Sequence, residues 1–95
     1  MAKIEWSELA VFDLQSIYDY ISEDSEVYAI RLINKFVVKV EVLDKFPNSG
    51  RIVPEFNANE IRELIEGNYR IIYRIEDIEK NISILRIHHA ARILK

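Results

Sequence analysis

The chain has 95 residues, 49% of them hydrophobic, and its 13 basic and 16 acidic residues give a net charge of −3. It contains no cysteine and two histidines, which excludes a disulfide framework and a zinc site built from thiolates or several imidazoles. No apolar run approaches the roughly 20 residues of a membrane-spanning helix, and the negative charge means that a nucleic acid would be bound only through a local basic patch.

A short strand followed by a helix is expected at the start of the chain. Residues 3–6 alternate between polar and apolar, as in a half-buried strand, and Ser7 is a suitable helix N-cap. Across residues 8–22 the apolar side chains recur every three or four positions and form one stripe of a helix, at Ala10, Leu14, Ile17 and Ile21. Phe12 falls on the opposite, polar face, where it is either a single exposed aromatic residue or a partner contact.

A second helix is expected after the polar break at residues 22–26. Its apolar stripe consists of Ala29, Ile33, Phe36, Val40 and Leu43. Residues 36–43 are also compatible with a strand, because β-branched valines alternate there with Lys39 and Glu41. One long helix is favoured, since the stripe continues the upstream pattern. The residues that then face outward are Val27, Val38 and Val42, which would meet a partner, form the seam of a homodimer, or be buried under a loop.

The second half of the chain is expected to form a long loop and three strands. Turn-forming residues dominate residues 47–59, and strand-like runs follow at 61–66, 69–76 and 81–88. The short connections between these runs predict an antiparallel meander. In the middle run, Tyr69, Ile71, Tyr73 and Ile75 share one face. The other face, which should be half exposed, carries Arg70, Ile72, Arg74 and Glu76.

The order of these elements predicts an α+β fold with an N-terminal strand and a two-helix hairpin packed on an antiparallel sheet. No linker-like segment divides the chain, so one domain over residues 1–95 is expected. We further expect no cofactor, no metal ion and no membrane contact, and a cytoplasmic location.

Several short motifs occur in an informative order along the chain. They comprise Trp6, Ala10, Asp13-Leu14, Tyr20-Ile21, residues 47–51, Arg62-Glu63, residues 67–74 and residues 84–92. In this order the chain resembles the ParE/RelE superfamily of bacterial and archaeal type II toxins over nearly its whole length. The most specific part is a Tyr-Arg-Ile-x-Tyr-Arg strand followed by a strand ending in His-x-x-Arg.

The resemblance implies a RelE/ParE-like fold and a toxin silenced by a cognate antitoxin from the same operon, often one that serves plasmid stabilisation. Small sheets leave unpaired backbone groups at their edges, which an added strand, or a helix laid in a groove, would cover. The residues expected to receive the antitoxin are Phe12, Val27, Val38 and Val42.

The two branches of the superfamily imply different targets. RelE-like members cleave messenger RNA in the ribosome, and on that branch Arg70, His89 and Arg92 would be catalytic. ParE-like members bind DNA gyrase and poison it without catalysis. The chain favours this second branch, because Glu63 stands on a strand where RelE-like nucleases carry lysines, and its negative charge repels phosphate. A degenerate, non-toxic module that only binds an antitoxin is a third hypothesis.

Six basic residues are expected to contact the target: Arg62, Arg70, Arg74, Arg86, His89 and Arg92. A purely structural interpretation stands beside this one. Cross-strand ion pairs with nearby glutamates would account for Arg70 and Arg74, and His89 would then brace the last strand.

Overall fold

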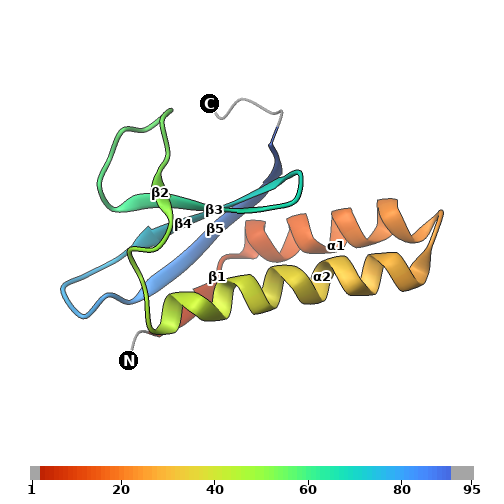
Figure 1. The fold of residues 1–95 in the computed structure, drawn as a ribbon, viewed down its shortest axis with the longest axis horizontal. Helices are drawn as coiled ribbons and strands as arrows, with labels where there is room; N and C mark the ends of the chain where they lie inside the picture. The colour runs from red at the N-terminus through yellow and green to blue at the C-terminus, as the bar shows by residue number, and fades with distance from the viewer. Residues whose placement is uncertain (1–2, 91–95) are drawn as a thin grey trace.

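The computed structural model describes residues 3–90 of the chain, which form a sheet and a helical hairpin (Figure 1). The helices are α1 (Glu8–Ser22) and α2 (Glu26–Glu41), followed by a short 3-10 turn, η1 (Val42–Asp44). The strands are β1 (Ile4–Trp6), β2 (Arg51–Ile52), β3 (Ile61–Glu66), β4 (Tyr69–Ile75) and β5 (Ile82–His89). The α+β fold expected from the sequence, with its N-terminal strand and helical hairpin, is confirmed.

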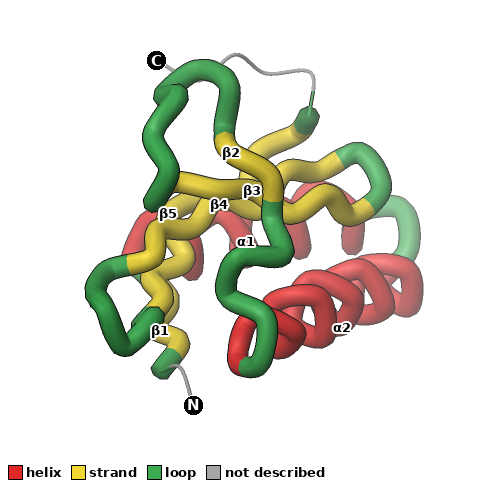
Figure 2. The backbone as a smooth tube through the Cα atoms, turned by 60° about the vertical axis from the view of Figure 1, so that its left-hand side comes forward, coloured by secondary structure: helices red, strands yellow, loops and turns green. Residues whose placement is uncertain are grey.

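The five strands form one sheet in the order β1-β5-β4-β3-β2. The predicted antiparallel meander of β3, β4 and β5 is confirmed, whereas β1 joins the sheet parallel to β5. Strand β2 lies within the predicted loop of residues 47–59 and pairs only with Arg62 and Glu63. Figure 2 shows the loop after β2 rising from the edge of the sheet opposite β1.

Both helices begin at serine caps. Ser7 accepts a hydrogen bond from the backbone N–H of Ala10, and Ser25 accepts one from that of Tyr28. The ambiguous residues 36–43 are helical up to Glu41 and continue into η1. Burying the apolar stripe against the sheet therefore outweighs the strand preference of the valines.

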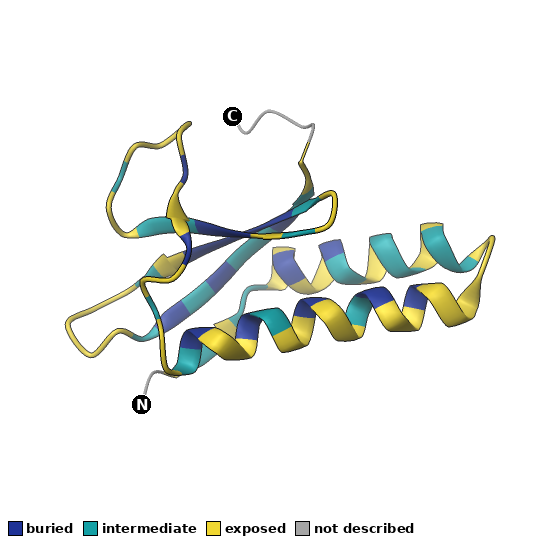
Figure 3. Cartoon of the chain, in the orientation of Figure 1, coloured by how far each residue is buried: buried dark blue, intermediate teal, exposed yellow. Residues whose placement is uncertain are grey.

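The core lies between the helical hairpin and the sheet, where the dark blue residues of Figure 3 face one another. The buried cluster contains Ala10, Leu32, Phe36, Val40, Leu43, Leu64, Ile71, Tyr73, Ile82, Ile84 and Ile87. Tyr73 also anchors the turn before β2, because its hydroxyl donates to the carbonyl of Pro47 and accepts from the N–H of Gly50. The face of β4 that carries Ile71 and Tyr73 is thus the core face, as predicted.

The opposite face of β4 is less exposed than the sequence predicts. Arg74 is exposed, but Ile72 and Arg70 are only 2% and 6% exposed. The reason is that the segment after β2 folds over this part of the sheet, burying Val53 and bringing Glu55 to Arg70. Alternation along a strand shows which residues share a face but not which loops cover it.

Candidate functional site

An ionic network lies on the outer face of β3 and β4. The guanidinium of Arg70 donates to both carboxylate oxygens of Glu55, at 2.7 and 2.8 Å, and to Glu63. Glu63 is 1% exposed and also accepts a hydrogen bond from Arg51. Arg70 thus lies on the outer face of the sheet, but it is only 6% exposed, so the expectation that its guanidinium is presented to a target is wrong. A buried carboxylate such as that of Glu63 needs cationic partners, which Arg51 and Arg70 provide. Glu55, from the segment after β2, adds a second carboxylate to Arg70.

The network keeps its central arginine charged. The hydrogen bonds that Arg70 donates to Glu55 raise its pKa, and the hydrogen bond to Glu63 and the charge of Glu63 raise it further, while burial acts in the opposite direction. The structural interpretation of this arginine, a cross-strand ion pair, is thus confirmed for Glu63.

Arg62 and Arg74 have different environments. Arg62 donates to the carbonyls of Asn48, Gly50 and Asn59, so it holds the two ends of the loop against the sheet. Arg74 keeps 46% of its side chain exposed, and its nearest carboxylate oxygen, on Glu76, is 4.0 Å away. Among the target-contact candidates on β3 and β4, Arg74 is the one whose guanidinium faces solvent.

Two other predicted target residues meet in a cleft of about 540 Å³ between α1 and the end of β5. Its lining consists of Asp13, Ser16, Ile17, Tyr20, Tyr69, Arg86, Ile87, His88 and His89. The rings of Tyr69 and His89 pack edge to face, with their centroids 5.6 Å apart. Burial, and then the neighbouring Tyr28 and Tyr20, raise the pKa of Tyr69, so its phenol stays protonated at neutral pH.

Asp13 controls the charge of this cleft. Its carboxylate accepts from Nε and Nη2 of Arg86, at 2.9 and 3.0 Å, and from the backbone N–H of Ile87, at 2.8 Å. The hydrogen bond to Asp13 raises the pKa of Arg86. The cleft therefore offers an imidazole and phenols for proton transfer, but its arginine is already neutralised by an internal carboxylate.

The predicted target residues do not form one continuous site. Arg62 and Arg70 hold the chain on either side of β2 against the sheet, Arg74 lies on the solvent side of β4, and Arg86 and His89 line the cleft. Arg92 lies outside the described residues.

Sequence reasoning missed the roles of Asp13, Tyr20 and Glu55. Asp13 had a detectable signal, since it is an acidic residue beside the apolar stripe of a helix, where a buried carboxylate requires a partner. Glu55 had none, because its contact depends on how an irregular loop folds back.

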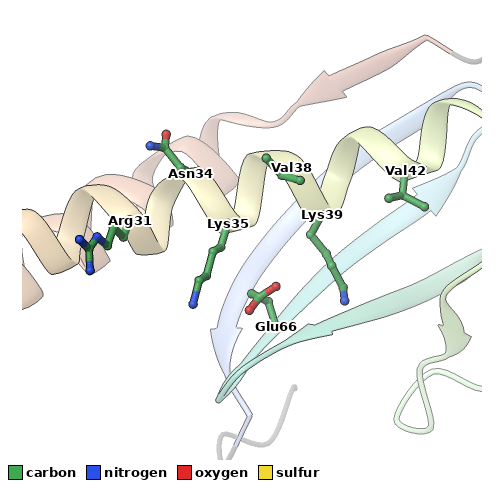
Figure 4. A pocket seen from close by; sticks show the side chains of 7 residues that line it. All are labelled: Arg31, Asn34, Lys35, Val38, Lys39, Val42 and Glu66. Carbon is green, nitrogen blue, oxygen red and sulfur yellow. The ribbon is translucent and has the colours of Figure 1, made fainter.

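The residues predicted to receive an antitoxin are exposed on the helices. Phe12, Val27, Val38 and Val42 are 66%, 62%, 64% and 45% exposed. Val38 and Val42 also line a groove of about 420 Å³ along α2 (Figure 4), together with Arg31, Asn34, Lys35, Lys39 and Glu66. Phe12 and Val27 are not among the residues that line this groove, so the four residues predicted to receive the antitoxin do not share one groove.

Residues 3–90 contain no group of three or more His, Cys, Asp or Glu side chains placed to hold a metal ion. Within the same residues, no helix is both long and apolar enough to cross a membrane.

Comparison with known proteins gives consistent matches. The family described as ParE toxin of type II toxin-antitoxin system, parDE, matches residues 4–94. A curated relative, Toxin RelE2 of Caulobacter vibrioides, is 33% identical over 94 residues, which are 98% of this chain and 100% of that protein.

Two solved toxin–antitoxin structures share the fold. The chromosomal ParDE system from P. aeruginosa is 28% identical with a TM-score of 0.75, and the match covers 94% of this chain and 96% of that one. The RelBE2 complex from Mycobacterium tuberculosis is 21% identical with a TM-score of 0.67, covering 93% and 96%.

Proposed function

The chain belongs to the ParE toxin family of type II toxin–antitoxin systems, and on that basis we propose that it binds and poisons DNA gyrase without catalysing a reaction. A cognate antitoxin neutralises it. The proposed target requires a cytoplasmic location, as the sequence led us to expect.

One observation supports a binding mechanism over RNA cleavage: two of the sheet arginines, Arg70 and Arg86, are paired with carboxylates of the chain itself. Arg70 is held by Glu55 and Glu63, and Arg86 by Asp13. A nuclease needs cations aimed at the charge that develops on the phosphate in the transition state. Cations already neutralised by carboxylates serve this purpose poorly, whereas a protein–protein interface needs only a complementary surface.

Within this proposal the target contacts are Arg74, Arg86 and His89, with Arg92 as a candidate from the sequence alone. Arg62 and Arg70 then support the surface by fixing the segment that covers the outer face of the sheet.

Gyrase-catalysed supercoiling of relaxed plasmid tests the proposal directly. The purified chain should block supercoiling, and addition of the antitoxin should restore it. Arg74→Ala should raise the half-inhibitory concentration by roughly fivefold, as expected for the loss of about 1 kcal/mol of binding. Lys80→Ala, which changes an exposed cation in the β4–β5 turn, is the matched control and should have no effect. Unimpaired supercoiling at saturating protein would refute gyrase as the target.

Ribosome-dependent cleavage of messenger RNA is the second candidate, favoured by the placement of His89, Tyr69 and Arg86 in one cleft. It predicts new primer-extension stops in translated transcripts, lost in His89→Ala. A third candidate, the non-toxic module, predicts normal growth when the chain is expressed without its antitoxin.

A further inference from the structure

The outer edge of β3 changes character along its length. Strand β2 pairs with it only at Arg62 and Glu63, and the backbone N–H of Val53 donates to the carbonyl of Ile61. In an antiparallel ladder, alternate residues direct their N–H and C=O groups to the same side. Ile65 therefore directs its backbone groups to the outer edge, and no described strand pairs with it there.

The groove of about 420 Å³ along α2 reaches the end of this edge, because Glu66 of β3 forms part of its lining (Figure 4). Its apolar surface is provided by Val38 and Val42, which are 64% and 45% exposed. Because Ile65 directly precedes Glu66 in β3, the open edge and the groove are adjacent, and the two together are called the recess.

The charge of the recess is opposite to that of the whole chain. Arg31, Lys35 and Lys39 line it against one carboxylate, Glu66, which gives a local charge of +2 from three cations and one anion, although the chain carries −3. Figure 4 shows the side chains of Lys35 and Lys39 extending from α2 on the side where Glu66 lies. A partner segment that fits here is acidic and carries aliphatic side chains for the two valines.

The dimensions match an extended segment. From Arg31 to Val42 the helix rises about 16 Å at 1.5 Å per residue, which an extended chain spans with about five residues at 3.3 Å each. A strand that pairs with Ile65 would meet the groove beside Glu66, which lies opposite Lys35 and Lys39 in Figure 4.

We infer that this recess, which consists of the edge of β3 at Ile65 and the groove of α2 at Lys35, Val38, Lys39 and Val42, receives an extended acidic segment of the antitoxin. The segment adds a short strand to β3 and places its carboxylates on the lysines. This inference rests on the antitoxin partnership of the proposed function and adds to it the place, conformation and charge of the contact.

Isothermal titration calorimetry with the full-length antitoxin encoded beside the toxin gene tests the charge of the contact. Lys35→Glu/Lys39→Glu should weaken binding at least about a hundredfold at low salt, since close charge pairs across interfaces contribute several kcal/mol. The difference should shrink as salt is raised. Lys45→Glu/Lys80→Glu is the control, because it reverses two charges outside the groove and should leave the Kd within about threefold.

Amide hydrogen exchange measured by NMR tests the added strand. The N–H of Ile65 should exchange quickly in the free chain and become protected in the complex, while that of Ile78, whose side chain is 94% exposed in the β4–β5 turn, should stay fast in both.

The possible failures are distinguishable. Equal affinities of the groove variant and the wild type, or an Ile65 amide that stays unprotected in a tight complex, would overturn the inference and leave the antitoxin partnership intact. Absence of any binding to the wild-type chain would refute the partnership itself, and with it the inference. If Lys35→Glu/Lys39→Glu instead dissociated a dimer of the chain alone, the occupant would be a second copy, and the inference would be overturned.

Discussion

Replacing Arg70 with methionine removes the central cation of the network on the outer face of the sheet. Methionine retains a long apolar side chain, so the change removes mainly the charge and its hydrogen bonds. The carboxylate of Glu63, which is 1% exposed, would keep only Arg51, whose side chain is 66% exposed. Glu55 is 25% exposed and can regain water. We therefore expect a loss of about 3 kcal/mol, the lower end of the range for breaking a buried ion pair.

Arg74→Met on the same strand is the matched control. Its guanidinium is exposed and lies 4.0 Å from Glu76, so the substitution should cost less than about 1 kcal/mol. Urea denaturation at pH 7, followed by circular dichroism, measures both variants as a shift of the unfolding midpoint. The loss expected for Arg70→Met is a large part of the roughly 5–15 kcal/mol that stabilises an ordinary domain.

A double substitution separates the charge of Glu63 from the rest of the site. Arg70→Met/Glu63→Leu removes both partners, and it should be more stable than Arg70→Met alone because no uncompensated carboxylate stays buried. Equal and small losses for Arg70→Met and Arg74→Met would refute this reasoning, since Arg70 would then contribute no more than a surface cation. A loss of toxicity in Arg70 variants should accordingly be interpreted together with their stability.

Three further substitutions test other contacts. Burial raises the pKa of the Tyr73 phenol above its ordinary value of 10.0. The protonated phenol therefore contributes fully to stability below pH 10, and this contribution is lost as the pH rises through the raised pKa. Tyr73→Phe should make the loss of stability at alkaline pH less steep, and an unchanged pH profile of stability would contradict this. Gly50→Ala should cost about 1–3 kcal/mol or prevent folding, because its Cβ would lie 2.6 Å from the Tyr73 hydroxyl; a wild-type thermal midpoint would refute the close packing. Asp13→Ala should cost about 2–4 kcal/mol by leaving the N–H of Ile87 and the guanidinium of Arg86 without this acceptor, and a chemical denaturation midpoint unchanged from wild type would contradict it.

The helices and the three long strands are predictable because their apolar residues repeat with the period of the element that buries them. Leu14 and Ile17, one turn apart, mark α1, and the alternation of Tyr69 with Ile71 marks β4. Strand β2 has no such pattern, since its two residues pair only because the loop brings them to β3.

The candidate site is less predictable than the fold. Arginines on a strand can be read from the sequence, but whether a guanidinium meets solvent or a carboxylate depends on distant residues. Arg70 is covered by a loop that lies 15 residues earlier, at Glu55, and Arg86 is paired with Asp13 across 73 positions. The exposed valines of α2 were easier to predict, because helical periodicity alone places them opposite the buried stripe.

The parallel pairing of the first and last strands links the two ends of the described chain. Ile4 lies beside Ile82, and the backbone N–H of Lys3 donates to the side chain of Asn81 across 78 positions, so β1 has no strand to join until β5 has been synthesised. Such distant contacts carry the largest loop-closure entropy and tend to form late. A nascent chain that ends before β5 therefore leaves β1 without a neighbour and one side of β4 uncovered, so the finished surface exists only after β5 has been synthesised.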